Sequence, residues 1–573
     1  MGMFSSTALM AIGIVSIGAT AYPSLDDVCT TAKVQAALPA EGLFPGVGFD
    51  SASVTANSIT NSSISSAAFF PDGIIDFCNI AVIYSHIGRN DSVTLAYWLP
   101  APSAFQNRFL TTGGGGYAIN SGITASGPRP ASLAGGTLYG AVSGATDGGF
   151  GSFSTNFDRV FNAAGNGTSN YEALFMFGYQ AIHELTVFGQ EITKNFYSMG
   201  DQRLYSYYQG CSEGGREGWN QIQRFGDQFD GAITGAPAFR FSHQQVQHLW
   251  QNVVVKQAGY TPTTCELARI TRAMIDACDH LDGKVDGVIA RSDLCKLTFE
   301  YNTTIGLSYS CDAALPSMLS GGHPAESGTV TAEAATIAAR SDGGIKDDEG
   351  RQVYFSYQPA AGSYADATTS LDPATGQEVF AVNSFGSEFV TRFLQFKNTN
   401  NFDSFANGGT DTRTLCKPRT PNFRNAGGKI LHFHGEADDS IPIASSVRCH
   451  DSVCTIMYPE ASYNDSSSSL SEWYKIFVVP GAAHCSINAG QLNGPFPQTN
   501  LAVMIQWVEK GVEPVTLNAT HLAGSHIGDN AQICAWPLRP QWSGNATAPS
   551  CVYDQAGIDL FTYSLDAFPL PVY

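Results

Sequence analysis

Gly210-Cys211-Ser212-Glu213-Gly214 is a tight-turn sequence from which the expected architecture of the whole chain follows. It fits the pattern G-x-S-x-G, in which a serine lies on a sharp turn between a strand and a helix. A β-rich run at 204–208 precedes it, and Trp219, Ile222 and Phe225 follow at helical spacing. The glycines permit the strained turn that lifts the serine hydroxyl above the edge of a sheet. We therefore predict a nucleophilic serine; the alternative is a glycine-rich structural turn.

A nucleophilic serine needs a base, and the base needs an acid that orients it. The strand-like run 429–433 leads to Asp438, and the strand-like run 473–479 leads to His484. Both residues follow the serine in the order typical of this turn, which is serine, acid, histidine. The sequence therefore predicts a catalytic triad of Ser212, Asp438 and His484.

Three neighbouring residues are alternatives for the acid and the base. His432 and His434 are alternative bases, although their position beside the strand of the acid favours packing or a loop hydrogen bond. Asp439 is the alternative acid.

A glycine run provides the second requirement of acyl transfer, which is a site for the developing oxyanion. Four glycines occupy 113–116, after a short strand-like run, and they let the backbone approach a substrate oxygen closely. We predict the backbone N–H groups of Glu213 and Gly115 as the oxyanion donors. A phosphate cradle is the alternative, but neither Lys-Ser/Thr nor dinucleotide-binding spacing follows the run.

Strand-like and helix-like runs alternate over about 93–235 and again after 425. This alternation predicts an α/β class, with a parallel sheet covered by helices on both faces. The segment between is rich in Gly, Ser, Thr and Ala and predicts an inserted lid. The expected organisation is a leader at 1–21, a first core part at 22–240, a lid at 241–425 and a second core part at 426–573.

The composition and the N-terminal sequence indicate the cellular compartment and exclude some classes of binding partner. The chain has 573 residues, 43% of them hydrophobic, and 30 basic against 50 acidic residues give a net charge of −20. No basic cluster stands out, which argues against nucleic acid or an anionic membrane as a partner. The apolar run 8–21 is too short to span a bilayer and ends in Ala-Thr-Ala, so it predicts a cleaved signal peptide and a secreted protein.

Cysteines and glycosylation sequons agree with secretion. The 13 cysteines indicate disulfides in an oxidising compartment, and their odd number leaves at least one without an intramolecular partner. Sequons occur at Asn61, Asn90, Asn166, Asn302, Asn464, Asn518 and Asn545.

Two of the cysteines flank the predicted nucleophile and base. Cys211 precedes Ser212, and Cys485 follows His484. If the serine and the histidine lie within hydrogen-bond distance, the two sulfurs are close enough to bridge. The alternative is a pair of unrelated buried thiols.

An acidic loop in the lid is a candidate cation site. Asp279, Asp282 and Asp286 are spaced by three and four residues with glycines between them, so carboxylates and backbone carbonyls could wrap a hard cation. The loop is not an EF-hand, because the twelve-position pattern and its terminal Glu are missing. A solvated Asp-Gly turn is the alternative.

Together these residues resemble the fungal tannase/feruloyl esterase family. The resemblance rests on Gly-Cys211-Ser212-Glu-Gly-Gly, His434-Gly-x-x-Asp438, Gly-Ala-Ala-His484-Cys485, the glycine run and the acidic loop. It extends over nearly the whole mature chain, and the stretches 234–241, 265–267 and 569–573 look more like tannase than feruloyl esterase.

The resemblance implies an α/β-hydrolase fold with a large inserted lid, the triad named above and a Cys211–Cys485 bridge. It also implies a structural Ca²⁺ in the lid. The implied calcium ligands are Asp279, Asp282 and Asp286 with the carbonyls of Lys284 and Val288. The other implied disulfides are Cys29–Cys78, Cys265–Cys311, Cys278–Cys295 and Cys534–Cys551. Cys416, Cys449 and Cys454 have no place in this scheme, and the stretch 408–427 looks shorter than in tannases.

The implied activity is hydrolysis of galloyl esters to gallate through an acyl-enzyme. The substrate is then a small-molecule or polyphenol aromatic ester. One alternative is a feruloyl esterase that releases hydroxycinnamates from plant cell wall. A second alternative, from another class, is a secreted binding protein without catalytic activity, against which the intact Ser/Asp/His set argues.

Overall fold

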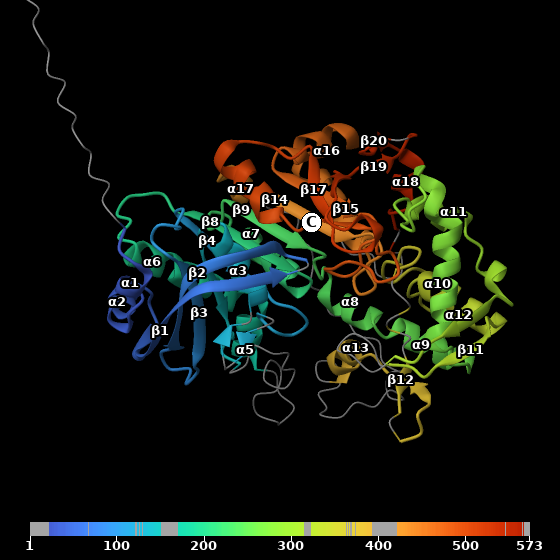
Figure 1. Ribbon diagram of the computed structural model, residues 1–573, viewed down its shortest axis with the longest axis horizontal. Coiled ribbons are helices and arrows are strands. Elements are labelled where there is room, and N and C mark those ends of the chain that lie inside the picture. The colour runs from blue at the N-terminus through green and yellow to red at the C-terminus, as the bar shows by residue number, and fades with distance from the viewer. Residues whose placement is uncertain are drawn as a thin grey trace, which may run out of the picture.

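The computed structural model describes residues 22–66, 68–120, 123–124, 127–128, 130–150, 170–314, 322–361, 364, 366, 369–372, 374–391, 421–544, 546–563 and 565. Its centre is a nine-stranded sheet with the order β1-β2-β3-β7-β4-β8-β9-β14-β15 (Figure 1). The strands are β1 (Val47–Ser66), β2 (Phe70–His86), β3 (Val93–Pro100), β4 (Arg108–Thr112), β7 (Ala141–Thr146), β8 (Tyr205–Cys211), β9 (Gly231–Gly235), β14 (Lys429–Gly435) and β15 (Tyr474–Val479).

The sheet is antiparallel at one end and parallel at the other. Strands β1, β2, β3 and β7 pair antiparallel. From β7 through β4, β8, β9, β14 and β15 every pairing is parallel. The parallel strands at the centre are almost wholly buried, which explains why they read as continuous apolar runs in the sequence. The predicted α/β class and the three strand-like runs that lead to the nucleophile, the acid and the histidine are confirmed.

Helices cover both faces of the sheet, and alternate strand residues point to opposite faces. Tyr208, Ala232 and Ile430 pack in one core, whereas Tyr207, Ile233 and Leu431 pack in the other. The helices of the core are α1 (Leu25–Val28), α2 (Thr31–Ala37), α3 (Pro130–Leu138), α5 (Tyr171–Phe175), α6 (Ala181–Phe196), α7 (Glu213–Arg224), α14 (Pro421–Asn425), α15 (Ala444–Met457), α16 (Tyr463–Ser471) and α17 (Asn500–Lys510). Of these, α17 packs on β9 and β14.

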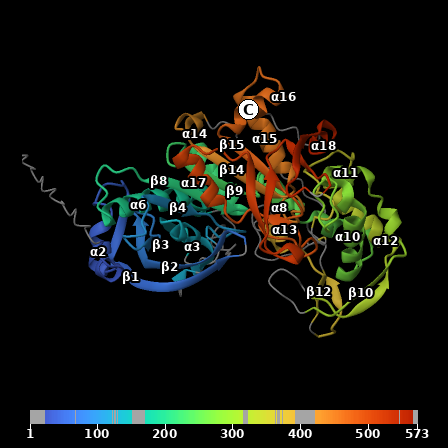
Figure 2. The ribbon, with the colours of Figure 1, turned by 45° about the horizontal axis from the view of Figure 1, so that its top comes forward.

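The lid lies between β9 and β14. Its elements are α8 (Phe241–Gln247), α9 (Trp250–Ala258), α10 (Thr264–Cys278), α11 (Ser292–Thr298), α12 (Ala332–Asp342) and α13 (Ser384–Phe389), with the hairpins β10 (Ser308–Cys311)–β11 (Glu326–Thr329) and β12 (Thr369–Leu371)–β13 (Glu378–Phe380). None of the described residues of this segment joins the large sheet. Figures 1 and 2 show α10 and α12 at the end of the molecule opposite the β1–β2 hairpin. The chain then returns to the core, as the alternation of strand and helix patterns predicted.

The last part of the chain, on both sides of α17, adds small antiparallel sheets. These consist of β16 (Pro495–Phe496), β17 (Thr516–His521) and β18 (Asn530–Cys534), and of β19 (Leu538–Gln541) with β20 (Ser550–Tyr553), followed by α18 (Gln555–Asp559). No helix in the described part of the chain is both long enough and apolar enough to span a bilayer.

All five disulfides implied by the resemblance are present. They are Cys29–Cys78, Cys211–Cys485, Cys265–Cys311, Cys278–Cys295 and Cys534–Cys551. Cys449 is also disulfide-bonded, whereas Cys454 is a buried free thiol. The leader at 1–21, the sequons at Asn166 and Asn545, and Cys416 lie outside the described residues.

Candidate active site

Ser212 lies on the turn that joins β8 to α7, at the carboxyl end of a central strand. Its backbone has φ 66° and ψ −124°, a left-handed conformation that L-residues rarely adopt. The Ser212 N–H donates to the Gly235 carbonyl at 2.9 Å, which ties the turn to the neighbouring strand β9. The strained turn predicted from the sequence is therefore held in place by the sheet.

The glycines after Ser212 allow α7 to approach the sheet closely. A Cβ at Gly214 would lie 2.8 Å from the Gly114 carbonyl oxygen, and one at Gly215 would lie 2.3 Å from the Gly235 carbonyl oxygen. Both distances are too short for a side chain, so only glycine fits. This close packing aims the N-terminus of α7 at the space in front of the serine.

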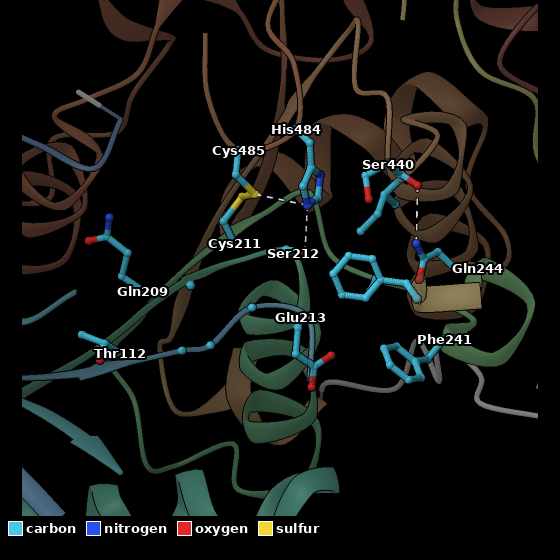
Figure 3. Close-up of a pocket in the computed structure, with 18 of the residues that line it drawn as sticks. Thr112, Gln209, Cys211, Ser212, Glu213, Phe241, Gln244, Ser440, His484 and Cys485 are labelled. Carbon is cyan, nitrogen blue, oxygen red and sulfur yellow. Dashed lines mark hydrogen bonds between the residues drawn. A yellow bond between two sulfur atoms is a disulfide. The ribbon is translucent and has the colours of Figure 1, made fainter. Parts of the chain in front are cut away.

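The structure brings the three predicted triad residues together, and Figure 3 shows two of them, Ser212 and His484. Ser212 Oγ lies 2.8 Å from His484 Nε2. On the other side of the ring, His484 Nδ1 lies 2.9 Å from Asp438 Oδ2 and 3.1 Å from Oδ1. This arrangement allows His484 to take the serine proton while Asp438 fixes the ring orientation.

Asp438 is a buried carboxylate with several donors. Its Oδ1 accepts the backbone N–H groups of Ser440 at 2.9 Å and Ile441 at 2.7 Å. Burial alone would raise the pKa of Asp438, but the charge of His484 and hydrogen bonds from His434 and His484 lower it below the usual range. In the same way burial would lower the pKa of His484, but the charge of Asp438 raises it. The pair therefore favours the ionised acid and a basic imidazole.

The structure also separates the triad residues from the alternatives. Asp438, not Asp439, is hydrogen-bonded to His484. His432 and His434 are fully buried on β14, and neither contacts Ser212, so neither can serve as its base.

The prediction of Gly115 as an oxyanion donor is corrected. The Gly115 N–H donates to the Ala118 carbonyl at 3.1 Å, because the loop closes on itself there. Gly113 and Gly114 donate to Gln209 O and Glu217 Oε2. Of the four loop glycines, Gly116 alone has an N–H without a partner in the described part of the chain.

The Glu213 N–H is the first of α7 and has no acceptor among the described residues. Glu213 and Gly116 both line the pocket in front of Ser212. The Glu213 side chain is paired with Arg216, which is also buried. The backbone of Glu213 is therefore available to a substrate oxygen while its carboxylate is neutralised elsewhere.

A disulfide joins the two loops that carry the nucleophile and the base. Cys211 and Cys485 are separated by 274 residues in sequence, and their Cα atoms lie 6.1 Å apart. The Cys485 sulfur lies 3.8 Å from His484 Nε2. The bond therefore links the carboxyl end of β8 directly to the loop after β15 (Figure 3).

The pocket in front of the triad has a volume of about 400 Å³. Aromatic and small side chains make up much of its wall, including Phe69, Phe70, Phe241 and Phe385. Figure 3 shows Thr112 and Gln209 on one side of Ser212, and Phe241 and Gln244 on the other. A flat aromatic group fits such a pocket, with its ester carbon placed at the serine.

A chain of hydrogen bonds forms the polar wall of the pocket on the lid side. His248 Nδ1 lies 2.9 Å from Asp366 Oδ2, and Gln244 Nε2 lies 2.7 Å from His248 Nε2. The Gln245 amide donates to Gln244 Oε1 at 2.5 Å, and Tyr117 donates to Gln245 Oε1 at 3.0 Å. Because Asp366 fixes the His248 tautomer, the amides of both glutamines are held in one orientation.

Comparison with known proteins identifies the group to which this site belongs. The family model described as "Tannase and feruloyl esterase" matches residues 78–555. A tannase from Aspergillus oryzae is 41% identical, over 98% of this chain and 99% of that protein. The chain belongs to the tannase and feruloyl esterase family.

Solved structures of the tannase and feruloyl esterase family agree with this assignment. The structure of tannin acyl hydrolase from Aspergillus niger is similar with a TM-score of 0.88 and 49% identity, covering 96% of this chain and all of that one. Feruloyl esterase B from Aspergillus oryzae gives a TM-score of 0.66 and 26% identity, covering 91% of this chain and all of that one. The α/β-hydrolase-type fold of the family is thus the fold of this chain.

Sequence reasoning missed several residues of this family member's site. Gln244, Gln245 and His248 lie on or just after α8, at the beginning of the lid. Their i, i+1, i+4 spacing directly after a core strand was the available signal. Glu217 was also missed, although a glutamate in a glycine-rich helix next to the nucleophile is unusual.

The acidic loop on which the family resemblance partly rests is present, and its three carboxylates differ in their surroundings within the protein. Asp279 accepts the backbone N–H groups of Asp286, Gly287 and Val288. Asp286 pairs with Lys284 Nζ at 2.8 Å. Within the described ranges no three His, Cys, Asp or Glu side chains converge as metal ligands. Asp282 is nevertheless buried, and burial together with the charges of Asp286 and Asp279 raises its pKa to about 6.

Proposed function

We propose that this protein is a secreted serine hydrolase that cleaves galloyl esters to gallate through an acyl-enzyme. The observation that carries the proposal is the 2.8 Å contact of Ser212 Oγ with His484 Nε2 at the end of an aromatic pocket. Membership in a family of tannases and feruloyl esterases supports ester hydrolysis. The 41% identity to a tannase, against 30% to a probable feruloyl esterase, supports the galloyl substrate.

The first half of the reaction acylates the serine. His484 Nε2 takes the Ser212 proton as Oγ attacks the ester carbonyl carbon, and Asp438 stabilises the imidazolium that forms. The carbonyl oxygen becomes an oxyanion and accepts hydrogen bonds from the N–H groups of Glu213 and Gly116. The imidazolium then gives its proton to the leaving alcohol or phenol, whose bond to the acyl carbon breaks.

The second half releases the acid. Water attacks the acyl carbon of the galloyl–Ser212 ester while His484 takes its proton. The same two N–H groups hold the second oxyanion. Collapse of this intermediate returns the proton to Ser212 Oγ and releases gallate.

The polar wall accounts for acyl selection. Gln245 uses one N–H and one carbonyl lone pair within the wall, so it keeps one donor and one acceptor for a ligand. Vicinal hydroxyls on a galloyl ring can satisfy a donor and an acceptor side by side. The methoxy group of a feruloyl ring accepts but cannot donate, which leaves one buried partner unpaired.

The decisive experiment compares kcat/KM for methyl gallate and methyl ferulate in the wild type. We expect a preference for gallate, and a preference for ferulate contradicts the galloyl assignment while leaving the esterase intact. Ser212→Ala should abolish turnover and labelling by a serine-directed phosphonate, whereas Ser486→Ala, two residues beyond the base, should retain both. A folded wild type that the phosphonate does not label contradicts the proposal that the protein is a serine hydrolase.

The polar wall has its own matched test. Gln245→Leu should lower kcat/KM for methyl gallate about 10- to 100-fold, because a buried hydroxyl loses its partner. Activity on p-nitrophenyl acetate should stay within about threefold, since acetate does not reach this wall. Gln247→Leu, the same change on the same helix but outside the pocket lining, is the control.

Secretion is part of the proposal and rests on the leader at 1–21 and the disulfides. N-terminal sequencing of protein from the culture medium of expressing cells should read from Tyr22. Protein that stays inside the cells with Met1 intact contradicts it.

A structural Ca²⁺ in the lid is a further part of the proposal. Asp279, Asp282 and Asp286, with the carbonyls of Lys284 and Val288, would hold it through oxygen ligands alone, as calcium prefers. The buried Asp282 beside two like charges supports a cation there, since such a carboxylate is otherwise costly. The ion would stabilise the loop and take no part in the reaction.

A further inference from the structure

Two buried histidines lie behind the triad, and the mechanism above does not use them. His432 and His434 are two residues apart on β14 and so share one face of the strand, and both are 0% exposed. Ser446 of α15 lies between them, with its Oγ 2.9 Å from His432 Nε2 and 2.7 Å from His434 Nδ1. Such a buried polar group is retained only where each member has a partner.

The group is continuous with the acid of the triad. His434 Nε2 lies 3.1 Å from Asp438 Oδ2 and 2.9 Å from the Ile441 carbonyl oxygen. At the far end, the Tyr474 hydroxyl on β15 lies 3.0 Å from His432 Nδ1. Tyr474, His432, Ser446 and His434 thus form one hydrogen-bonded chain whose last ring contacts Asp438 Oδ2; we call these residues the histidine chain.

The ends of the histidine chain fix its direction. A carboxylate and a backbone carbonyl only accept, so His434 Nε2 carries a proton and donates. With one proton on each imidazole, His434 Nδ1 accepts from the Ser446 hydroxyl, and Ser446 accepts from His432 Nε2–H. His432 Nδ1 then accepts from the Tyr474 hydroxyl. Burial lowers the pKa of His432 well below its usual value, which agrees with a neutral ring.

We propose that His434, oriented by Ser446 and His432, is a positioning residue that holds the carboxylate of Asp438 for His484. The inference rests on the proposed serine-hydrolase function. Asp438 follows β14 on a loop, and its Oδ1 is fixed by two backbone N–H groups of that loop. The histidine chain provides the restraint on Oδ2, the oxygen nearest His484, from the rigid strand β14 and helix α15.

Loss of this restraint has two expected effects. A carboxylate free to rotate misaligns His484, which lowers kcat with little change in KM. The loss of one donor also leaves Asp438 a stronger acceptor, which stabilises the imidazolium and raises the pKa of His484. The acid limb of kcat/KM then moves to higher pH.

Other groups around Asp438 set the background against which this shift is read. His484 and Asp439 lie on the loops beside it, and Tyr354 and Tyr357 face it from the lid. Behind His432 lies His450 of α15. None of these groups is changed in the test below.

The test compares His434→Leu, His434→Gln and Ser446→Ala. His434→Leu should lower kcat about 10- to 100-fold with KM within about threefold, and should move the acid limb upward. His434→Gln keeps a donor near the position of Nε2 and should restore most of kcat. Ser446→Ala should give an intermediate loss, while Ser445→Ala, the adjacent buried serine on the same helix, is the control.

A readout without substrate separates this inference from the proposed function. The downfield ¹H NMR resonance of the His484 Nδ1 proton should shift in His434→Leu and return toward the wild-type position in His434→Gln. If the wild type hydrolyses no aromatic ester, the proposed hydrolase function is contradicted, but the shift of the His484 resonance in His434→Leu can still be measured. An unshifted resonance and acid limb in folded His434→Leu or Ser446→Ala, or equal losses in His434→Gln and His434→Leu, overturns the positioning role.

Discussion

Glu217 Oε2 accepts the Gly114 N–H at 2.9 Å, and this bond ties the glycine loop to the helix that begins at the nucleophile. Gly114 returns the contact, because its carbonyl accepts the Gly214 N–H at 3.1 Å. Burial and the charge of Glu213 raise the pKa of Glu217 well above its usual value, which favours the neutral acid. One helix therefore carries the Glu213 N–H at its start and also fixes the loop that carries the Gly116 N–H.

Replacing Glu217 should affect the transition state more than substrate binding. We expect Glu217→Leu to lower kcat about 10- to 100-fold at similar KM, because a loosened loop misplaces its N–H. Glu217→Gln mimics the neutral acid and should stay within about fivefold of wild type. Binding of a boronic acid transition-state analogue should weaken in parallel with kcat. Equal losses of kcat in Glu217→Leu and Glu217→Gln would show that the Glu217–Gly114 hydrogen bond does not position the loop.

Asp438 and Asp439 should differ sharply when each is changed to asparagine. Asp438→Asn should lower kcat about 10⁴-fold, because it removes the charge that stabilises the imidazolium. Since Asp438 raises the pKa of His484, the remaining activity should persist to lower pH than in wild type. Asp439→Asn should cost less than about tenfold. The check is the pH profile of kcat/KM, and a larger loss at Asp439 would reverse the assignment.

The Cys211–Cys485 bond should matter for both stability and turnover. The double change to alanine should destabilise the fold by about 2–5 kcal/mol, because the bond closes a long loop in the unfolded chain. It should also lower kcat, since the two loops lose their link. Removing Cys534–Cys551, which spans 17 residues, is the control and should leave kcat within about twofold. Thermal unfolding measures the effect on stability, and steady-state kinetics measure the effect on kcat. An unchanged kcat in the variant without Cys211 and Cys485 would argue against a role of this disulfide in aligning Ser212 with His484.

Asp342 should make the lid less stable as the pH rises. It is buried against the hydroxyls of Tyr301 and Tyr364, and burial raises its pKa to about 7. Between about pH 4 and 7 the folded state keeps a proton that the unfolded state has lost, so stability falls as the pH rises through this window. Asp342→Asn should reduce the fall of Tm with pH, whereas Asp276→Asn, at an exposed position of α10, should not. If Asp342→Asn leaves the pH dependence of Tm unaltered, the proton that the folded state retains is bound by another group.

Calcium removal tests the acidic loop. EDTA should lower the Tm of wild type, and Ca²⁺ but not Mg²⁺ should restore it, because a loop with many carboxylate and carbonyl oxygens favours the larger ion. In Asp282→Asn the Tm should no longer respond to either addition. A wild type whose Tm ignores EDTA and Ca²⁺ has no calcium site that matters for stability.

Much of the fold was predictable because its central features are local. Strands buried on both faces read as unbroken apolar runs, and the turn at 210–214 has its own sequence pattern. Ser212, Asp438 and His484 each follow such a strand, so parallel topology alone collects them at one edge of the sheet. The resemblance to a family added the disulfide pairs.

The remaining features depend on contacts between distant segments. Gly115 was a wrong choice of donor because the partner of its N–H, Ala118, becomes evident only once the loop is folded. The pocket role of Gln244 depends on how α8 packs against Asp366 and Ser440. His434 was considered as a base, and only its distance from Ser212 and its contact with Asp438 indicate another role.

The separation of nucleophile and base along the chain has a consequence for biosynthesis. Ser212 leaves the ribosome 272 residues before His484, so a nascent or truncated chain carries the hydroxyl without its imidazole. Only after translation has passed residue 485 can the sulfur bond form that fastens them, and the cytosol would keep those thiols reduced. If the protein is secreted as proposed, full assembly of the reaction centre coincides with export, and the chain stays incomplete as a catalyst inside the cell that makes it.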